Sequence, residues 1–274
     1  MKTFCVLLST LLIGTFGKAK EFTYTASTPA GAVVKDFLGI SLHDSVDFIR
    51  WKLVISDEHY ALQCNYGIGK PNTSGFIDGG KIITTDGRLQ KEHKYYRLSN
   101  GSRKLTLAVL NIDLLQVANS DGSFLIGNGG WSYTLNNIHP LGNSQINFAA
   151  ATTAINDSSV FEGRTPCAVP GVIEPGTLCY KLKWKIVLYG NAKKNSPTTY
   201  KVFGTPWRKE GGRLAKWQII NTREGGMVYQ LNDEKGNGFL YLLKADENIL
   251  LFTGANGKVL TGDQDFSFTL NKVL

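Results

Sequence analysis

The chain has little of what metal and redox centres are built from. Its 274 residues include four histidines, four cysteines and two methionines. The histidines stand singly, without the close spacing of a metal site, as His43, His59, His93 and His139. Since Met227 is the only methionine after the first residue, few soft ligands for Cu(I) are present. We therefore predict no metal site and no cofactor.

Motifs that mark catalysis are missing as well. The sequence has no nucleophile elbow, no His-Glu-x-x-His pair, no phosphate-cradling loop and no dinucleotide fingerprint. The glycine-rich stretch 127–131 precedes a strand pattern, so it lacks the helix N-terminus that binds phosphate. We predict that the protein is not an enzyme and has no catalytic residues. An enzyme whose acids or histidine converge only in the fold is the alternative.

Long apolar runs are absent after the N-terminus. The apolar run at 4–16 follows Lys2 and precedes small residues, which is typical of a secretory signal peptide and too short for a membrane span. A hydrophobic core strand is the alternative. We expect that residues 1–19 are removed, that the mature protein is periplasmic or secreted, and that it has no transmembrane segment. Cys5 lies at the opening of the signal, so no lipid anchor is expected.

The excess of positive charge is not concentrated in any run. Thirty Lys and Arg against 22 Asp and Glu give a formal net charge of +8, and the apolar content of 42% is that of a globular protein. The basic residues are spread singly, which favours solubility. Nucleic-acid binding needs a basic stripe or a known module. We therefore predict no nucleic-acid partner.

Nearly the same ten residues stand in the middle and at the end of the chain, as GNGGWSYTLN (127–136) and GDQDFSFTLN (262–271). The match extends backwards over three further pairs of segments: 111–136 with 246–271, 49–55 with 182–188 and, more weakly, 24–30 with 161–167. We predict two tandem domains of about 115 residues, 20–137 and 157–274, joined by a polar, turn-rich connector at 138–156.

Each unit contains about seven or eight short strand patterns, a spacing typical of an antiparallel meander closed into a barrel or sandwich. Two-residue turn signals separate several of them: Asp86-Gly87, Asn100-Gly101, Asp121-Gly122, Gly211-Gly212 and Asn256-Gly257. We predict an all-β fold of two tandem antiparallel meander β-barrels of the lipocalin-like kind.

The repeated segment predicts a closing strand for each barrel. Alternate side chains of this strand are expected to face one core: Trp131, Tyr133, Leu135, Phe266, Phe268 and Leu270. The intervening Ser132 and Thr134 then face the other way. Other bulky positions predict packed barrel interiors with binding at the rim: Leu240, Leu242, Leu250 and Phe252.

Helix signals occur at one place in each unit. Thr28 is a candidate cap and Pro29 a candidate first helical residue. Apolar residues follow at helical spacing: Val33, Val34, Phe37 and Leu38. Since Thr165 and Pro166 stand at the matching positions of the second unit, we predict a short helix near the start of each barrel.

Three cysteines remain after the expected signal. Cys167 and Cys179 align with Ala30 and Val46, so the first unit lacks both together. Because both cysteines occur in the second unit and both are missing from the first, we predict that they form a structural disulfide in an exported protein. A redox-responsive pair and a metal-binding pair are the alternatives. Cys64 stands in a strand-like alternation and is expected to be a buried free thiol, with a reactive or intermolecularly bonded thiol as the alternative.

The second unit resembles the N-terminal domain family of NlpE, an envelope lipoprotein linked to copper resistance and surface-stress signalling. An aromatic-x-Gly-x-x-Pro-Cys opening carries the resemblance, at Phe161, Gly163, Pro166 and Cys167. A second cysteine then precedes a Leu-x-Leu-type strand, followed by TTYKVFG, GGRLAKWQI and the closing LLFTGANGKVL. The chain also resembles two-copy exported proteins of Bacteroidetes-type bacteria.

This resemblance implies a small lipocalin-like barrel in the periplasm or cell envelope that binds or senses. The chain departs from the family in three respects. Eleven residues separate Cys167 from Cys179, where the family has a close Cys-x-x-Cys, and the lipid-anchor cysteine is missing. The first unit keeps only Thr28-Pro29-Ala30 of the opening.

Together these patterns predict an exported, non-catalytic envelope protein that binds a small ligand or a protein partner through its barrels. The alternative is a copper- or redox-responsive envelope protein that uses Cys167 and Cys179. Trp207 lies in a turn-rich stretch and is a candidate rim residue, with core packing as the other interpretation. Trp131 and Arg164 are the other two candidate rim residues.

Overall fold

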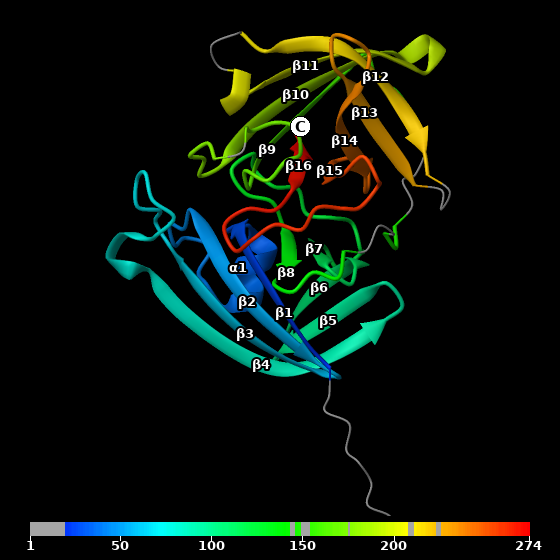
Figure 1. Cartoon of the computed structure of the whole chain (residues 1–274). Helices are drawn as coiled ribbons and strands as arrows, with labels where there is room; N and C mark the ends of the chain where they lie inside the picture. Colours follow the sequence, from blue (N-terminus) through cyan, green and yellow to red (C-terminus); the bar gives the residue numbers. More distant parts are fainter. Residues whose placement is uncertain (1–19, 143–145, 149–153, 175, 208–210, 223–225) are drawn as a thin grey trace, which may run out of the picture.

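Two closed antiparallel barrels of eight strands each follow one another along the chain (Figure 1). The computed structural model describes residues 20–142, 146–148, 154–174, 176–207, 211–222 and 226–274. The predicted fold class, a tandem pair of antiparallel β-barrels, is confirmed. The signal predicted at 1–19 lies outside the described residues. Within them, no helix has the length and apolar content needed to cross a bilayer.

The first barrel consists of β1 (Glu21–Pro29), β2 (Phe48–Ser56), β3 (His59–Gly67), β4 (Lys81–Glu92), β5 (Tyr95–Asn100), β6 (Arg103–Asn111), β7 (Leu114–Ala118) and β8 (Thr134–Asn137), with helix α1 (Ala32–Leu38) and the 3-10 turn η1 (Ile77–Gly79). The second consists of β9 (Ser158–Thr165), β10 (Leu182–Asn191), β11 (Ser196–Gly204), β12 (Arg213–Asn221), β13 (Met227–Asn232), β14 (Gly238–Lys244), β15 (Ile249–Thr253) and β16 (Thr269–Lys272), with the 3-10 turns η2 (Ala192–Lys194) and η3 (Thr205–Trp207). Each strand pairs with the next, and the last pairs with the first.

Alternating apolar residues fill each barrel with its own core. In β2 the inward side chains are Ile49, Trp51, Leu53 and Ile55, and all four are buried in the first core. The second barrel repeats the pattern along β10. The bulky residues expected inside it are buried in its core, as predicted: Leu240, Leu242, Leu250 and Phe252. Side chains therefore occupy these barrel interiors.

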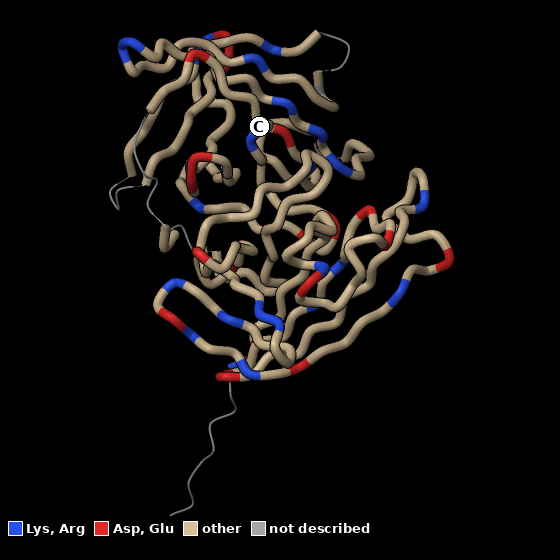
Figure 2. Tube along the Cα trace, turned by 180° about the vertical axis from the view of Figure 1, so that it is seen from behind, with Lys and Arg blue, Asp and Glu red and all other residues tan. Residues whose placement is uncertain are grey.

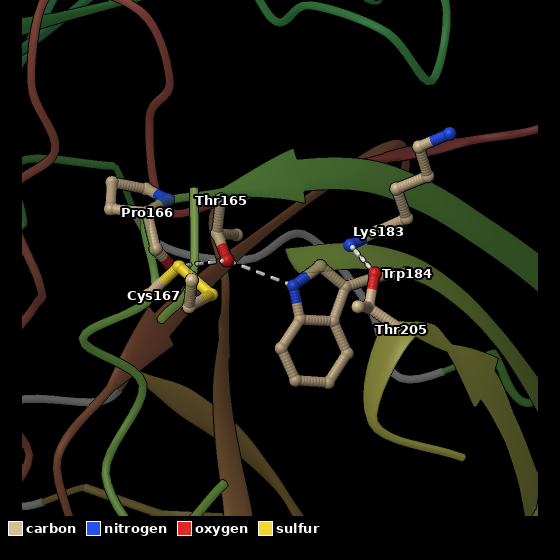
Figure 3. The surroundings of a disulfide bond; sticks show 7 residues. Thr165, Pro166, Cys167, Lys183, Trp184 and Thr205 are labelled. Atoms are coloured by element: carbon tan, nitrogen blue, oxygen red, sulfur yellow. Dashed lines mark hydrogen bonds between the residues drawn. A yellow bond between two sulfur atoms is a disulfide. The ribbon is translucent and has the colours of Figure 1, made fainter. Parts of the chain in front are cut away.

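One buried hydrogen bond is repeated in both barrels and supports the alignment of the two units. In the first barrel the indole Nε1–H of Trp51 donates to Thr28 Oγ1 at 2.8 Å. In the second, Trp184 Nε1–H donates to Thr165 Oγ1 at 2.9 Å (Figure 3). Each pair lies on the first two strands of its barrel, so a buried indole is satisfied in the same way twice.

The helix of the first barrel begins later than predicted. Thr28 and Pro29 belong to β1, where Pro29 is paired with Phe48, and the cap of α1 is Gly31. Thr28 is unavailable as a helix cap because its hydroxyl accepts the indole N–H and donates to a neighbouring carbonyl. The helix buries Val34, Phe37 and Leu38 against the first core, so it closes one end of that barrel.

The helix predicted for the second barrel is wrong: no α-helix occurs in the described part of this barrel. A disulfide between Cys167 and Cys179 spans the corresponding segment, with 6.0 Å between the Cα atoms (Figure 3). The predicted disulfide is therefore confirmed. The spanned segment is four residues shorter than that between Ala30 and Val46, and it contains helix-breaking Pro170. Its Val169 still packs into the second core.

Cys64 is a free thiol in the first core, as predicted. It lies on β3, paired with Trp51 on one side and Ile83 on the other. Burial raises the pKa of this thiol well above its ordinary value, which keeps it protonated and a poor nucleophile.

The two barrels contact each other through their closing strands, β8 and β16, which lie at the junction (Figure 1). Equivalent hydroxyls meet across it: Ser132 Oγ lies 2.5 Å from Ser267 Oγ, and Thr134 Oγ1 lies 3.0 Å from Thr269 Oγ1. Residues of each pair are 135 positions apart, the spacing of the repeat. The two copies are therefore related by an approximate two-fold axis at this contact.

Two reciprocal bonds extend this symmetry. Asn136 Oδ1 accepts from the backbone N–H of Gly262 at 3.0 Å, and Asn271 Oδ1 accepts from that of Gly127 at 2.7 Å. Ser132 and Thr134, predicted to face away from the barrel core, thus face the other copy. The repeated segments 127–136 and 262–271 therefore contribute to the closing strand of each barrel and also to the surface through which the two barrels contact each other.

A third hydrophobic cluster lies between the barrels. It takes Leu110 and Leu114 from the first barrel, and Leu243 and Leu251 from the second. The connector also takes part, since Phe148 packs edge-on against Tyr95 and Phe124 at centroid distances of 5.7 and 5.1 Å. Each barrel therefore has its own core and shares another with its neighbour.

Candidate functional site

A cleft of about 230 Å³ opens at the junction of the barrels, beside the approximate two-fold axis. Its walls contain four aromatic side chains, two from each copy: Phe48, Trp131, Tyr180 and Phe266. Trp131 and Phe266 occupy equivalent positions of the repeat, immediately before the paired serines. The docking of the two copies therefore brings equivalent positions to one cavity.

Trp131 and Phe266 were expected in the barrel cores, and this prediction is wrong. The regular closing strands begin only at Thr134 and Thr269. Before them, Asn128 Oδ1 accepts from the N–H groups of Gly130 and Trp131, both at 3.0 Å. In the second copy Asp263 Oδ1 accepts in the same way from Asp265 and Phe266, both at 2.8 Å. This pair of Asx turns directs the aromatic residue into the cleft.

Stacked rings support the wall on the side of the first barrel. Trp131 stacks on Phe48 with 4.7 Å between ring centroids, and Phe48 stacks on Phe76 at 4.3 Å. The guanidinium of Arg164 lies over the Trp131 ring, 5.5 Å from its centroid. Two of the predicted rim residues, Trp131 and Arg164, thus come together although they belong to different barrels.

The opposite wall comes from the segment that follows the disulfide. Tyr180 meets Phe266 edge-on at 6.0 Å between centroids. The ammonium of Lys181 lies 5.1 Å from the Tyr180 centroid and 5.5 Å from that of Phe266. Because Cys179 directly precedes these residues, the disulfide anchors one lip of the cleft.

Lys and Arg residues are scattered over both barrels (Figure 2), but the cleft is locally positive. Four cations line it, Arg50, Lys70, Arg164 and Lys181, against two carboxylates, Asp47 and Asp265. Asp265 forms an ion pair with Arg50 of the other barrel at 2.5 Å. Asp47 Oδ2 accepts from the N–H of Gly69 at 2.7 Å.

Burial and repulsion shift the ionisation of the cleft residues. Burial lowers the pKa of Lys181, and the charges of Arg164 and Lys183 lower it further, with Asp265 opposing them. Burial also raises the pKa of Asp265, against the opposing charge of Arg50. Both directions show that charged groups are partly withdrawn from water at this junction.

Trp207, the third predicted rim residue, lies apart from the cleft. It belongs to the core of the second barrel, with 8% of its surface exposed, and packs against Trp184 and Phe239 at centroid distances of 5.8 and 5.7 Å. The core-packing interpretation therefore describes it. Trp207 is the last residue of η3, which follows β11.

A larger hollow of about 390 Å³ lies on the first barrel alone. Tyr66 and Val46 contribute apolar surface, and Asp78 and Lys81 stand exposed at its border. It lacks the convergence of buried rings and cations seen between the barrels. Within the described ranges, no three His, Cys, Asp or Glu side chains gather as a metal site requires.

Several cleft residues were not predicted from sequence: Phe48, Arg50, Tyr180, Lys181 and Asp265. Phe48 and Arg50 lie at the start of β2, and Tyr180 and Lys181 lie just before β10. Asp265 lies in the Asx turn of the second copy. The available signal was the repeat itself, because Phe48 and Lys181 occupy matching positions.

Comparisons of the chain with protein-family models, with curated proteins and with solved structures find no match.

Proposed function

We propose that the protein is an exported, non-catalytic envelope protein that holds a small ligand in the cleft between its two barrels. One observation carries the proposal: rings and cations from both copies converge on a cavity of about 230 Å³. Concave sites with apolar walls and a few placed polar groups are where small ligands bind. The volume suits a molecule smaller than a typical drug.

The packed barrel cores support a site at the junction. In lipocalin-like barrels a ligand occupies the interior only where side chains leave room. Here the inward residues of both barrels, such as Trp51 and Phe252, are almost completely buried among their neighbours. A site between the barrels requires both copies, since each copy contributes only one wall of the cleft.

An envelope location is supported by three features. The disulfide between Cys167 and Cys179 belongs in an oxidising compartment. The sequence of residues 1–19 is typical of a signal peptide. The resemblance of the second copy to the NlpE N-terminal family supports the same compartment.

The disulfide also favours a second candidate, a copper- or redox-responsive role. Both sulfur atoms are bonded to each other, so copper binding by Cys167 and Cys179 first requires their reduction. Titration of the reduced protein with Cu(I) separates the two candidates. Tight binding that is lost in Cys167→Ser supports the copper role.

Tyr180 offers a direct test of the cleft, because 56% of its surface is exposed and its removal leaves the cores intact. A panel of sugars, amino acids and organic acids is screened by thermal shift on the full exported protein. We expect compounds that stabilise the protein to bind about fivefold more weakly to Tyr180→Ala, since a ring contact contributes about 1 kcal/mol.

Tyr189 provides the matched control, as another exposed tyrosine of the second barrel that does not line the cleft. Tyr189→Ala is expected to bind the same compounds like the unmodified chain. Ligands that bind Tyr180→Ala and Tyr189→Ala equally would place the site elsewhere, and absence of any bound compound would count against a small-molecule role.

A further inference from the structure

We infer that the ligand of the cleft is an anion, with a carboxylate or phosphate group held between Arg164 and Lys181. The inference rests on the proposed function, because it names the chemistry of the same cleft. It goes further in assigning two side chains of the second barrel as the groups that bind charge.

The two carboxylates of the cleft are already engaged. Asp265 is paired with Arg50, and Asp47 accepts the backbone N–H of Gly69. Among the described residues, Arg164 and Lys181 form no ion pair. Partial burial and the charge of Arg164 lower the pKa of Lys181, and Asp265 only partly offsets this, so the two cations lack a full counter-charge. An anion placed between them relieves both effects.

Aromatic rings hold these two cations in place. Arg164 lies over Trp131, and Lys181 lies over both Tyr180 and Phe266. A cation held over a ring keeps its N–H groups free to donate, because the ring face engages the charge and not the hydrogen atoms. A guanidinium fixed in this way suits the paired oxygens of a carboxylate or phosphate.

The two copies differ at the positions of these charges. The first copy has Ser27 where the second has Arg164, and Phe48 where the second has Lys181. Both cations thus come from the second copy alone, on a contact that is otherwise nearly symmetric. Ser27 instead donates to the carbonyl of Gln264 at 2.8 Å, a packing role.

Arg50 adds an independent sign of a missing acceptor. Its Nη2 atom donates to Asp265 and to the carbonyl of Ser74, at 2.5 and 2.6 Å. Its Nε–H is buried and has no acceptor among the described residues. Buried donors in folded proteins are nearly always satisfied, so this N–H needs an acceptor that the described residues do not supply.

Inorganic phosphate and acetate are the minimal probes of the two oxyanions, and glucose is the neutral probe. Each is titrated into the full, disulfide-bonded protein, with the Nε–H signal of Arg164 and the indole signal of Trp131 followed by NMR. We expect phosphate or acetate to shift both signals saturably and glucose to shift neither. The anion that saturates at the lower concentration identifies the preferred group.

Arg164→Gln and Lys181→Gln are each expected to weaken anion binding about tenfold or more, because a hydrogen bond to a charged group contributes about 1.5–3 kcal/mol. Added neutral salt is expected to weaken it too. Lys193→Gln, in η2 and outside the cleft, is the control and is expected to bind normally.

The outcomes separate the inference from the function on which it rests. If neither anion shifts the cleft signals, or if both glutamine variants bind like the unmodified chain, the inference is wrong. A neutral compound from the thermal-shift panel that binds in the cleft would then leave the proposed function standing. Absence of any compound in the cleft would contradict both.

Discussion

Replacing Leu250 with alanine is expected to destabilise the second barrel by about 2–5 kcal/mol. Leu250 lies on β15, is completely buried and faces the core of that barrel alone. Removing its side chain leaves a cavity that the closed sheet cannot easily collapse around. Chemical denaturation measures the loss, and hydrogen exchange is expected to quicken mainly in β10 to β15.

The next residue, Leu251, is a matched comparison with a different expected result. It is equally buried, but its side chain points into the cluster shared by the two barrels. We expect Leu251→Ala to cost a similar free energy of unfolding, with exchange quickened in β6 and β7 of the first barrel too. If the two variants gave the same exchange pattern, the shared cluster would not couple the barrels.

Loss of the disulfide is the second large effect. In the chain-entropy model, opening a bridge between residues 12 positions apart lowers the free energy of unfolding by about 3 kcal/mol. We expect the double variant Cys167→Ser with Cys179→Ser to show this loss in urea denaturation. Because Tyr180 and Lys181 follow the bridge directly, ligand binding in the cleft is expected to weaken as well.

The control for this experiment is the unmodified protein in a reductant, which is expected to match the double variant. The first barrel is expected to be unaffected, since α1 and not a disulfide closes it. Equal stability of the oxidised and reduced proteins would show that the second barrel is closed without help from Cys167 and Cys179.

The fold was predictable because the repeat and the strand alternation agree. Trp51 and Trp184 align in sequence and make the same hydrogen bond in the two barrels. The paired presence of Cys167 and Cys179 in one copy was enough to predict their bond. These features are local, or follow from comparing the chain with itself.

Predictions failed where a local signal was overridden by packing. Asp86-Gly87 was expected to be a turn but lies within β4. Gly87 is needed there for close approach, since a Cβ atom would lie 2.6 Å from the carbonyl oxygen of Ser99. The Tyr60 hydroxyl donates to that same carbonyl at 2.8 Å, so the ring covers the strand at this point.

The cleft was only half predictable, for a similar reason. Trp131 and Arg164 were each predicted as rim residues, but the sequence did not predict that docking of the two barrels brings them together. The serine and threonine that face out of each closing strand gave the one clue, because they are repeated with the strand. Their partners, Ser267 and Thr269, are the same residues of the second copy.

The central claim is that the two copies dock through equivalent faces of their closing strands and so create the cleft. Ser132→Cys combined with Ser267→Cys tests it most directly, because the two hydroxyl oxygens lie 2.5 Å apart. Under mild oxidation we expect an intramolecular bond between positions 132 and 267, found by peptide mass spectrometry and absent from either single variant. A folded double variant that forms no such bond would contradict the docking of the two barrels.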